Sequence, residues 1–148
     1  ENKLIDFLFR GQALGIAGAS AAAGTGPANL YIGLLTAIPT DGTAGTEVAG
    51  DNYARMAVAS SLENWAGTQE AASVDASSGT SGTTSNNDTI LLPTPDPLGW
   101  GPVVAMGIYD MPIGGNLLIY SALAISKVIN AGDAVPFPPG ALTFQIDN

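Results

Sequence analysis

The stretch VVAMGIYDMPIGGNLLIYSALAISKVINAGDAVPFPPGALTFQID, residues 103–147, decides the fold class of this 148-residue chain. It contains two apolar runs, Val103–Tyr109 and Leu117–Ile125, that are rich in the branched and aromatic residues typical of β-strands. Between them, Met111–Asn116 combines a proline, two glycines and an asparagine, as a hairpin connection does. Further turns are predicted at residues 130–133 and 138–140. The tail therefore predicts consecutive antiparallel strands.

The upstream sequence adds strands of the same kind. Leu30–Ala37 is an almost continuous apolar run, typical of a strand buried on both faces, and Tyr53–Ser60 is the next candidate. Ile90–Leu92 is followed by three prolines, which cannot donate to a ladder, so we expect this strand at a sheet edge. With six to eight strands, the sequence predicts a mainly β fold, either an antiparallel β-sandwich or a partly open barrel, with a short N-terminal α-helix.

Residues 2–10, NKLIDFLFR, carry a helical pattern. The polar residues Asn2, Lys3, Asp6 and Arg10 share one arc of the helix, and Asp6 precedes Arg10 by four positions, a favourable spacing for an ion pair. A helix this short needs a docking partner to be stable. Two alternatives are open, docking on its own domain or on a neighbouring subunit. The candidate assembly contact is its apolar face, formed by Leu4, Ile5, Phe7, Leu8 and Phe9.

Composition changes along the chain suggest how it is organised. Residues 1–27 combine the helix with an Ala/Gly-rich arm, and residues 28–148 are expected to form a single β domain. Within that domain, residues 66–89 are rich in Gly, Ser and Thr and predict a flexible polar loop. Trp65 directly precedes this loop and is expected to be a packing anchor, and Trp100, just before the C-terminal strands, is expected to cap one end of the core.

Charge and composition exclude several function classes. The net charge is −9 with only four basic residues, so the chain has no basic stripe that could neutralise a nucleic acid. Cysteine and histidine are absent, which removes disulfides, thiolate metal sites and every imidazole-based mechanism. No apolar run approaches the roughly 18 residues of a membrane-spanning helix. We therefore expect neither a nucleic-acid partner nor a membrane partner.

Carboxylates are the plentiful ionisable groups, so an acid/base pair is the form that catalysis would take. Asp96, Asp110 and Glu63 are available, but none lies in a recognisable motif. Acidic residues beside Gly, Pro and Asn usually serve turn chemistry, as in the run Tyr109-Asp110-Met-Pro. We therefore predict no catalytic residues, and a protein that is not an enzyme.

Calcium is the metal that oxygen ligands alone can bind. The loop at residues 41–52 supplies four such ligands, but their spacing misses the pattern of a calcium-binding loop. They are Asp41, Glu47, Asp51 and Asn52. An ordinary solvated acidic loop is the competing interpretation, and we predict no metal and no cofactor.

Aromatic side chains raise the possibility of a sugar-binding platform. Six of them are candidates, namely Tyr31, Tyr53, Trp65, Trp100, Tyr109 and Tyr120. Most lie within strand patterns, where core packing is the default, and only a coplanar exposed set would bind a glycan. A carbohydrate-binding β module is therefore kept as the alternative function.

The order of segments resembles a family of small tailed-bacteriophage virion proteins, usually labelled tail-fibre proteins or minor structural proteins. The resemblance covers nearly the whole chain, from ENKLIDFLFRG through PANLYIGLLTAIPTD to INAGDAVPFPPGALTFQID. Its most specific pieces are LYIGLLT at residues 30–36, NYAR at 52–55, GIYD at 107–110 and the closing hairpin with its AGD turn.

This resemblance implies a non-enzymatic structural component of a virion, either tail-fibre-like or a capsid-decoration (cement) protein. It also implies other virion proteins as partners and a homo-oligomer, with a trimer favoured. We add the hypothesis that the N-terminal segment anchors the protein to its assembly. The alternative, a carbohydrate-binding module, could serve host-receptor attachment.

Overall fold

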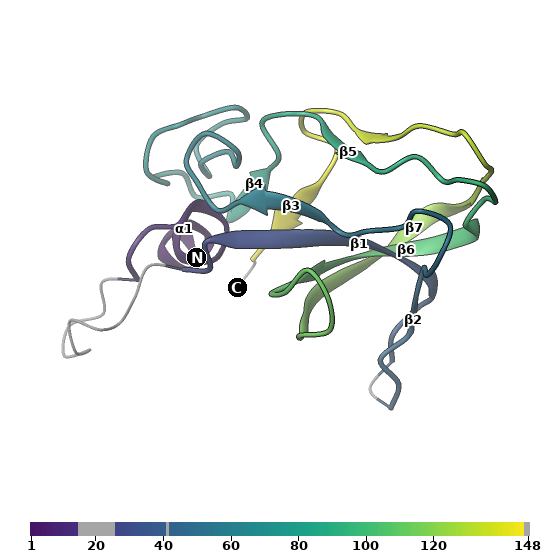
Figure 1. The fold of residues 1–148 in the computed structure, drawn as a ribbon. Coiled ribbons are helices and arrows are strands. Elements are labelled where there is room, and N and C mark those ends of the chain that lie inside the picture. Colours follow the sequence, from purple (N-terminus) through teal and green to yellow (C-terminus); the bar gives the residue numbers. More distant parts are fainter. Residues whose placement is uncertain (15–25, 41, 147–148) are drawn as a thin grey trace. The chain divides into compact units, whose positions relative to one another are not determined.

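The computed structural model describes residues 1–14, 26–40 and 42–146, and in them the chain forms one helix and nine strands (Figure 1). Most of the expected Ala/Gly-rich arm, residues 15–25, lies outside the described residues. The elements are α1 (Asn2–Arg10), β1 (Asn29–Ala37), β2 (Thr46–Glu47), β3 (Met56–Ala59), β4 (Thr83–Ser85), β5 (Ile90–Leu92), β6 (Gly101–Tyr109), β7 (Leu117–Ile129), β8 (Val135–Phe137) and β9 (Thr143–Gln145).

The largest sheet has the strand order β2-β1-β6-β7, with β3 also paired to β1. Two small sheets join β4 to β9 and β5 to β8. The pairings of β1 with β2 and β6, of β6 with β7 and of β4 with β9 are all antiparallel. The predicted fold class, mainly β with antiparallel sheets and one short N-terminal helix, is confirmed. Over the described residues the sheets do not close into a barrel.

Two strand boundaries differ from the predicted ones. The strand expected at Tyr53–Ser60 begins only at Met56, after a turn in which the Tyr53 N–H donates to the backbone oxygen of Gly50 and in which Asp51 and Asn52 have positive φ. The last long strand, β7, continues four residues past the expected end at Ile125. The helix, in contrast, has the predicted bounds, and its cap Gly11 adopts a left-handed conformation with φ 66°.

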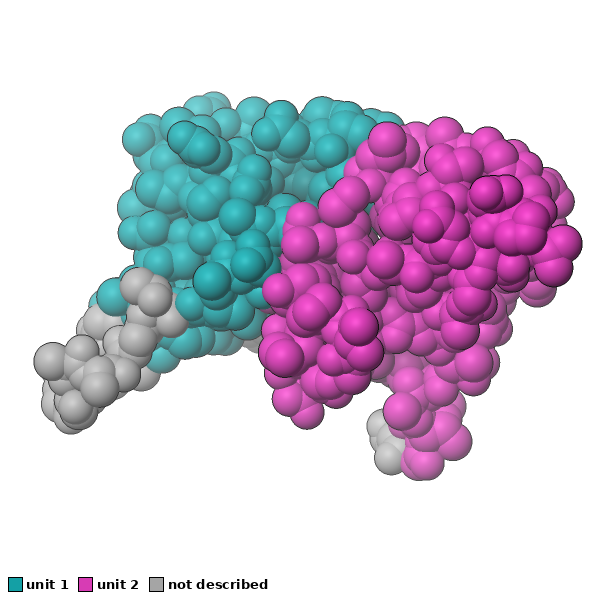
Figure 2. All heavy atoms as spheres, viewed as in Figure 1, with its two compact units in different colours: residues 1–29, 58–90, 137–148 teal, residues 30–57, 91–136 magenta. Residues whose placement is uncertain are grey.

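The chain divides into two compact units (Figure 2). Unit 1 comprises residues 1–29, 58–90 and 137–148, and unit 2 comprises residues 30–57 and 91–136. The boundary expected near residue 27 stays a prediction. The described part of the chain contains no helix long and apolar enough to cross a membrane.

Unit 1 has an aromatic core. Phe9, Trp65 and Phe144 pack together with ring centroids 5.0 to 5.9 Å apart, and α1 adds Ile5 to the same buried set. The Phe9 and Trp65 rings meet edge to face, whereas Phe9 and Phe144 stack. Trp65 is fully buried and therefore anchors this core, as its sequence position predicts.

Residues 66–89, the expected polar loop, contain β4 and several buried polar side chains. Asn86 is the clearest case, because its amide donates to the backbone oxygens of Asp88, Phe137 and Pro138 and its Oδ1 accepts from the backbone of Leu142. Side-chain hydrogen bonds thus hold a segment that has little apolar surface to bury.

Unit 2 is built on the pairing of β1 with β6. Ile32 lies opposite Ile108 and Leu34 opposite Met106, and all four side chains are buried. Trp100 closes this core, with its Nε1 donating to the backbone oxygen of Asp51 at 3.1 Å. The almost unbroken apolar sequence of β1 therefore reflects burial on both of its faces.

Candidate functional site

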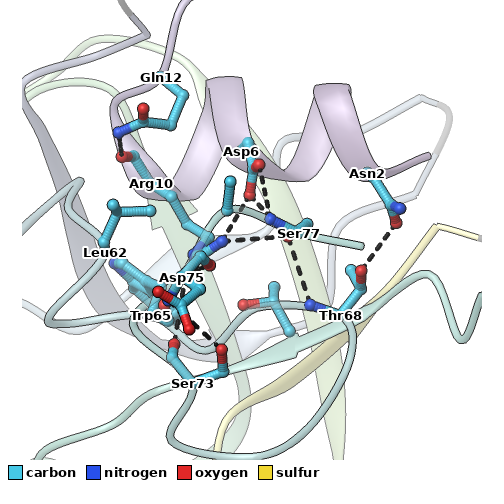
Figure 3. A network of polar contacts seen from close by, with 12 residues as sticks. Asn2, Asp6, Arg10, Gln12, Leu62, Trp65, Thr68, Ser73, Asp75 and Ser77 are labelled. Carbon is cyan, nitrogen blue, oxygen red and sulfur yellow. Dashed lines mark hydrogen bonds and ion pairs between the residues drawn. The ribbon is translucent and has the colours of Figure 1, made fainter. Parts of the chain in front are cut away.

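The helix α1, which belongs to unit 1, packs with Asp6 and Arg10 turned toward the rest of that unit (Figure 3). Asp6 and Arg10 form an ion pair at 2.7 Å, and the Arg10 side chain is fully buried. The sequence indicates this pair by its spacing, but it also places both residues on the polar arc that would normally face water. The structure instead places them among the residues of the 65–77 segment.

Each of the five N–H donors of Arg10 has an acceptor, which explains how this guanidinium can be buried. Nε donates to the backbone oxygen of Trp65 at 2.9 Å. Nη1 donates to Asp6 and to the Ser77 hydroxyl, and Nη2 donates to the backbone oxygens of Ser73 and Asp75 (Figure 3). The ion pair therefore joins α1 to the polar segment that follows Trp65.

The Asp6 carboxylate is satisfied in the same way. Its Oδ2 accepts from the backbone N–H of Ser77 at 2.9 Å and its Oδ1 accepts from the Ser77 hydroxyl at 2.6 Å. At the start of the helix, Asn2 donates to the backbone oxygen of Gly79 and accepts from the Thr68 hydroxyl. Three polar residues on successive turns of α1 thus face inward.

This docking separates the five residues of the candidate assembly contact. Ile5 and Phe9 are fully buried in the core of unit 1. Leu4 is 44% exposed, and Phe7 and Leu8 are half-buried. The helix therefore has an outer face of Leu4, Phe7 and Leu8, which we call the outer helix face.

A second polar cluster lies in unit 2 around Arg55. Its guanidinium contacts Glu47 through two hydrogen bonds of 2.7 Å, Nε to Oε1 and Nη2 to Oε2. Nη1 donates to the backbone oxygens of Met111 and Gly114, and the guanidinium carbon lies 3.4 Å from the centre of the Tyr109 ring. Arg55 thereby holds the turn that leads into β7.

Tyr53 completes the Arg55 cluster. Its hydroxyl donates to Glu47 Oε1 at 2.8 Å and accepts from the backbone N–H of Leu34 at 2.9 Å. Burial is the main reason that the pKa of Tyr53 is raised, and burial likewise raises the pKa of Tyr109. The hydrogen bonds to Glu47 raise the pKa of Arg55. The tyrosines therefore stay neutral and the arginine stays charged at physiological pH, an arrangement suited to holding structure.

Three of the motifs that carry the family resemblance meet in this cluster. NYAR supplies Tyr53 and Arg55, and GIYD supplies Tyr109. LYIGLLT supplies Gly33, where a Cβ would lie 2.9 Å from Glu47 Oε1, from the Tyr53 hydroxyl and from Tyr109 Cε2. These motifs, although far apart in the sequence, therefore meet in the Arg55 cluster.

A shallow depression of about 330 Å³ lies beside the Arg55 cluster within unit 2. Its lining includes Arg55, Glu47 and Ile113. The guanidinium already makes four hydrogen bonds and a ring contact in the protein. A ligand entering this depression would meet an arginine whose charge is already paired with Glu47.

The three candidate catalytic carboxylates show no acid/base arrangement. Glu63 and Asp96 are exposed to solvent. Asp110 accepts hydrogen bonds from the backbone and the side-chain amide of Asn116, each at 2.7 Å, and the backbone bond is the main reason that its pKa is lowered. A lowered pKa suits a turn residue and is the opposite of what a general acid requires.

Two of the four candidate calcium ligands in the acidic loop are engaged in other contacts. Glu47 pairs with Arg55, and Asn52 donates to the backbone oxygen of Thr94. Asp41 lies outside the described residues. In residues 1–14, 26–40 and 42–146 no three acidic side chains gather in a way that could hold a metal ion.

The six candidate aromatic residues do not form an exposed platform. Trp65, Trp100 and Tyr109 are buried, and Tyr31 and Tyr53 are half-buried. Tyr120, on β7, is 46% exposed. The carbohydrate-binding alternative stays a prediction that this arrangement does not favour.

Sequence reasoning did not find the Arg55 cluster or the inward docking of Arg10. A signal was present, since the chain has only four basic residues and two of them are these arginines. In a chain with 13 acidic residues, each arginine has many surface partners available. The buried positions could not be distinguished from surface positions without the fold.

Comparison with known proteins yields one family. Residues 1–145 match the family model described as Podophage GP4 fiber I protein gp80. The match spans nearly the whole chain, as does the resemblance identified from its motifs. No curated protein matches the chain at a significant level.

Proposed function

Because this chain belongs to the podophage GP4 fibre I protein gp80 family, a family of structural phage fibre proteins located in the virion, we propose that it acts as a fibre building block through protein–protein assembly. Membership in this family implies contacts with other virion components. The low charged fraction of 11% suits a surface that is covered in an assembly, since interface cores exclude charged residues. No catalytic step is part of this proposal.

We place the assembly contact on the outer helix face. The observation that carries this proposal is the orientation of α1, which turns Asp6 and Arg10 inward and leaves Leu4 44% exposed. The proposed assembly is a homo-oligomer, with a trimer favoured. A tail-fibre location fits the family description, and a capsid-decoration role stays the second possibility within the virion.

The test replaces Leu4 by glutamate in the purified full chain. If the outer helix face carries the contact, sedimentation equilibrium at matched concentration should give a trimer for the natural protein and association weakened at least tenfold for Leu4→Glu. Lys3→Glu is the matched control, because Lys3 is also exposed on α1 but lies outside the apolar face. Equal masses for all three proteins would contradict the proposed contact.

Deleting residues 1–27 would be a weaker test of the same idea. The deletion removes Ile5 and Phe9 from the core of unit 1 and Arg10 from its hydrogen-bond network. Loss of assembly would then follow from unfolding as readily as from a lost contact. Point variants on the outer helix face separate these two causes.

A further inference from the structure

Residues 67–80 of unit 1, which we call the 67–80 loop, have little packing of their own. None of these described residues belongs to a helix or a strand. The buried side chains of the loop are those of Thr68 and Ser73, which are polar. Its largest apolar side chain, Val74, is 55% exposed. Because the loop buries no large apolar side chain, hydrogen bonds must hold its shape.

The hydrogen bonds of the 67–80 loop have a restricted set of partners. Among the described residues, each of them either stays within residues 67–81 or goes to α1. The internal bonds include one from the Gln69 amide to the Ser73 hydroxyl and one from the Ser78 N–H to the Gln69 amide oxygen. α1 is therefore the element that fixes the position of this loop.

Seven hydrogen bonds join α1 to the 67–80 loop, and they come from three helix residues spaced four positions apart. The helix residues are Asn2, Asp6 and Arg10, and their partners in the loop are Thr68, Ser73, Asp75, Ser77 and Gly79 (Figure 3). The bonds thus run along the whole inner side of the helix. A displacement of α1 would break them together.

The backbone of the loop also shows that outside contacts hold it. Ala72 has φ 59°, in the left-handed region that residues with a Cβ seldom adopt. A segment with an unfavourable backbone conformation persists only where its surroundings impose that conformation. For the 67–80 loop, the described hydrogen bonds from outside the segment come from α1.

We propose that α1 orders the 67–80 loop, so that the docked helix and the ordered loop form one conformational unit. When α1 undocks, the loop loses all seven bonds and becomes disordered, because the remaining segment is rich in Ala, Ser and Gly and has no apolar core. The coupling is reciprocal, so whatever holds the helix in place also holds the loop.

The coupling is a property of the single chain and does not depend on the proposed assembly contact. Its consequence for the virion does rest on the proposed function. A partner that binds the outer helix face and keeps α1 docked would also keep the 67–80 loop ordered. A partner that pulls α1 away would release the loop.

The test measures the opening of the loop by limited proteolysis of the full chain with a glutamate-specific protease. Glu70 is the single glutamate of the 67–80 loop and is exposed, whereas Glu63 is exposed but lies outside the loop. The ratio of cleavage after Glu70 to cleavage after Glu63 therefore reports on the loop. Cleavage follows the population of the open form when opening and closing are fast. A concentration low enough to dissociate any assembly keeps the measurement on the single chain.

The variants change α1 and leave the sequence of the loop intact. Arg10→Lys keeps a positive charge beside Asp6 but carries its donors on one atom, so it cannot reach Trp65, Ser73 and Asp75 at once. We expect the cleavage ratio to rise roughly tenfold, the effect of losing a hydrogen bond to a charged group. Asn2→Ala removes two neutral bonds, and we expect a rise of about threefold.

Leu142→Ala is the matched control. Leu142 is buried in unit 1 and makes none of the seven bonds between α1 and the loop. Its truncation destabilises the unit as a whole. Global unfolding exposes both glutamates, so both cleavages should become faster together and their ratio should stay at the value of the natural protein.

Hydrogen exchange gives a second, independent measurement. The backbone N–H of Ser77 donates to the Asp6 carboxylate at 2.9 Å, so it is protected only while the helix is docked. In Asn2→Ala, exchange in residues 67–80 should become faster, whereas exchange in β4 should not change. This variant keeps Arg10 and its network, so it serves as the test even if Arg10→Lys fails to fold.

Two results would overturn the proposal. The first is a cleavage ratio and an exchange rate of the loop that are the same in Asn2→Ala and in the natural protein. The second is a ratio that Leu142→Ala raises as much as Arg10→Lys does, because the loop would then open only with the whole unit. Failure of the assembly contact would leave these measurements unchanged and would appear instead in the sedimentation of Leu4→Glu.

Discussion

The helix α1 and the strand β7 reverse the usual distribution of polar and apolar residues. α1 buries Asp6 and Arg10 while leaving Leu4 exposed. β7 exposes Ile125 and Tyr120 although its sequence is almost wholly apolar. In this chain, therefore, hydropathy alone does not decide which residues are buried.

The difference between the two elements lies in the partners that the chain offers them. Arg10 meets a carboxylate, a hydroxyl and three backbone oxygens, which together replace the water that it loses. β7 meets a single neighbouring strand, and none of the described residues pairs with its outer edge. A buried charge with all its partners is stable within one chain, whereas an exposed apolar edge is a surface that a second chain can cover.

The largest effect is expected from the removal of Arg10. Arg10→Ala leaves the Asp6 carboxylate buried without its cation and leaves three backbone oxygens without donors. We expect a loss of about 3–5 kcal/mol in the free energy of unfolding, the usual cost of breaking a buried ion pair by removing one partner. Urea unfolding monitored by tryptophan fluorescence, to which Trp65 in the same core contributes together with Trp100, measures this loss.

The matched variant on β7 is Ile125→Thr. Because Ile125 is exposed, we expect its replacement to change the stability of the single chain by no more than about 0.5 kcal/mol. Measurements at a concentration low enough to dissociate any assembly give the value for the single chain. A cost for Arg10→Ala as small as that for Ile125→Thr would show that the buried network contributes little.

A smaller effect is expected at Gly33, in the Arg55 cluster, which holds the turn before β7. A Cβ there would lie 2.9 Å from three atoms of Glu47, Tyr53 and Tyr109, so Gly33→Ala must displace part of the Arg55 cluster. We expect a loss of about 1–3 kcal/mol in the free energy of unfolding, the typical cost of overpacking.

Gly42→Ala is the control for this substitution. A Cβ at Gly42 meets no atom within 4 Å, and the glycine does not have a positive φ. We expect a change within about 0.5 kcal/mol there. Thermal or urea unfolding measures the loss in both variants. A loss for Gly33→Ala as small as that for Gly42→Ala would contradict the crowding argument.

Most of the secondary structure could be predicted from the sequence, because its signals are local. The apolar run at Leu30–Ala37 and the spacing of residues 2–10 each lie within one element. The side of α1 that is buried could not be predicted, since the acceptors of Arg10 lie 55 to 67 positions further along the chain, apart from Asp6. Likewise, nothing local in Leu117–Ile129 distinguishes an exposed edge strand from a covered one.

The smallest expected effect concerns Asp110, which fixes the turn between β6 and β7. The backbone N–H of Asn116 holds the pKa of this carboxyl below its ordinary value of 3.8, so the folded state favours the ionised form. The stabilisation is therefore fully present above pH 3.8 and is lost as the pH falls through the lower folded-state pKa. Asp110→Asn cannot accept both hydrogen bonds, since its amide nitrogen is a donor. We therefore expect the natural protein to have a slightly higher urea midpoint than this variant, by an amount that is constant near neutral pH. The difference between the two midpoints should disappear on acidification. A difference that grows in acid would mean that the turn does not depend on the ionised carboxylate.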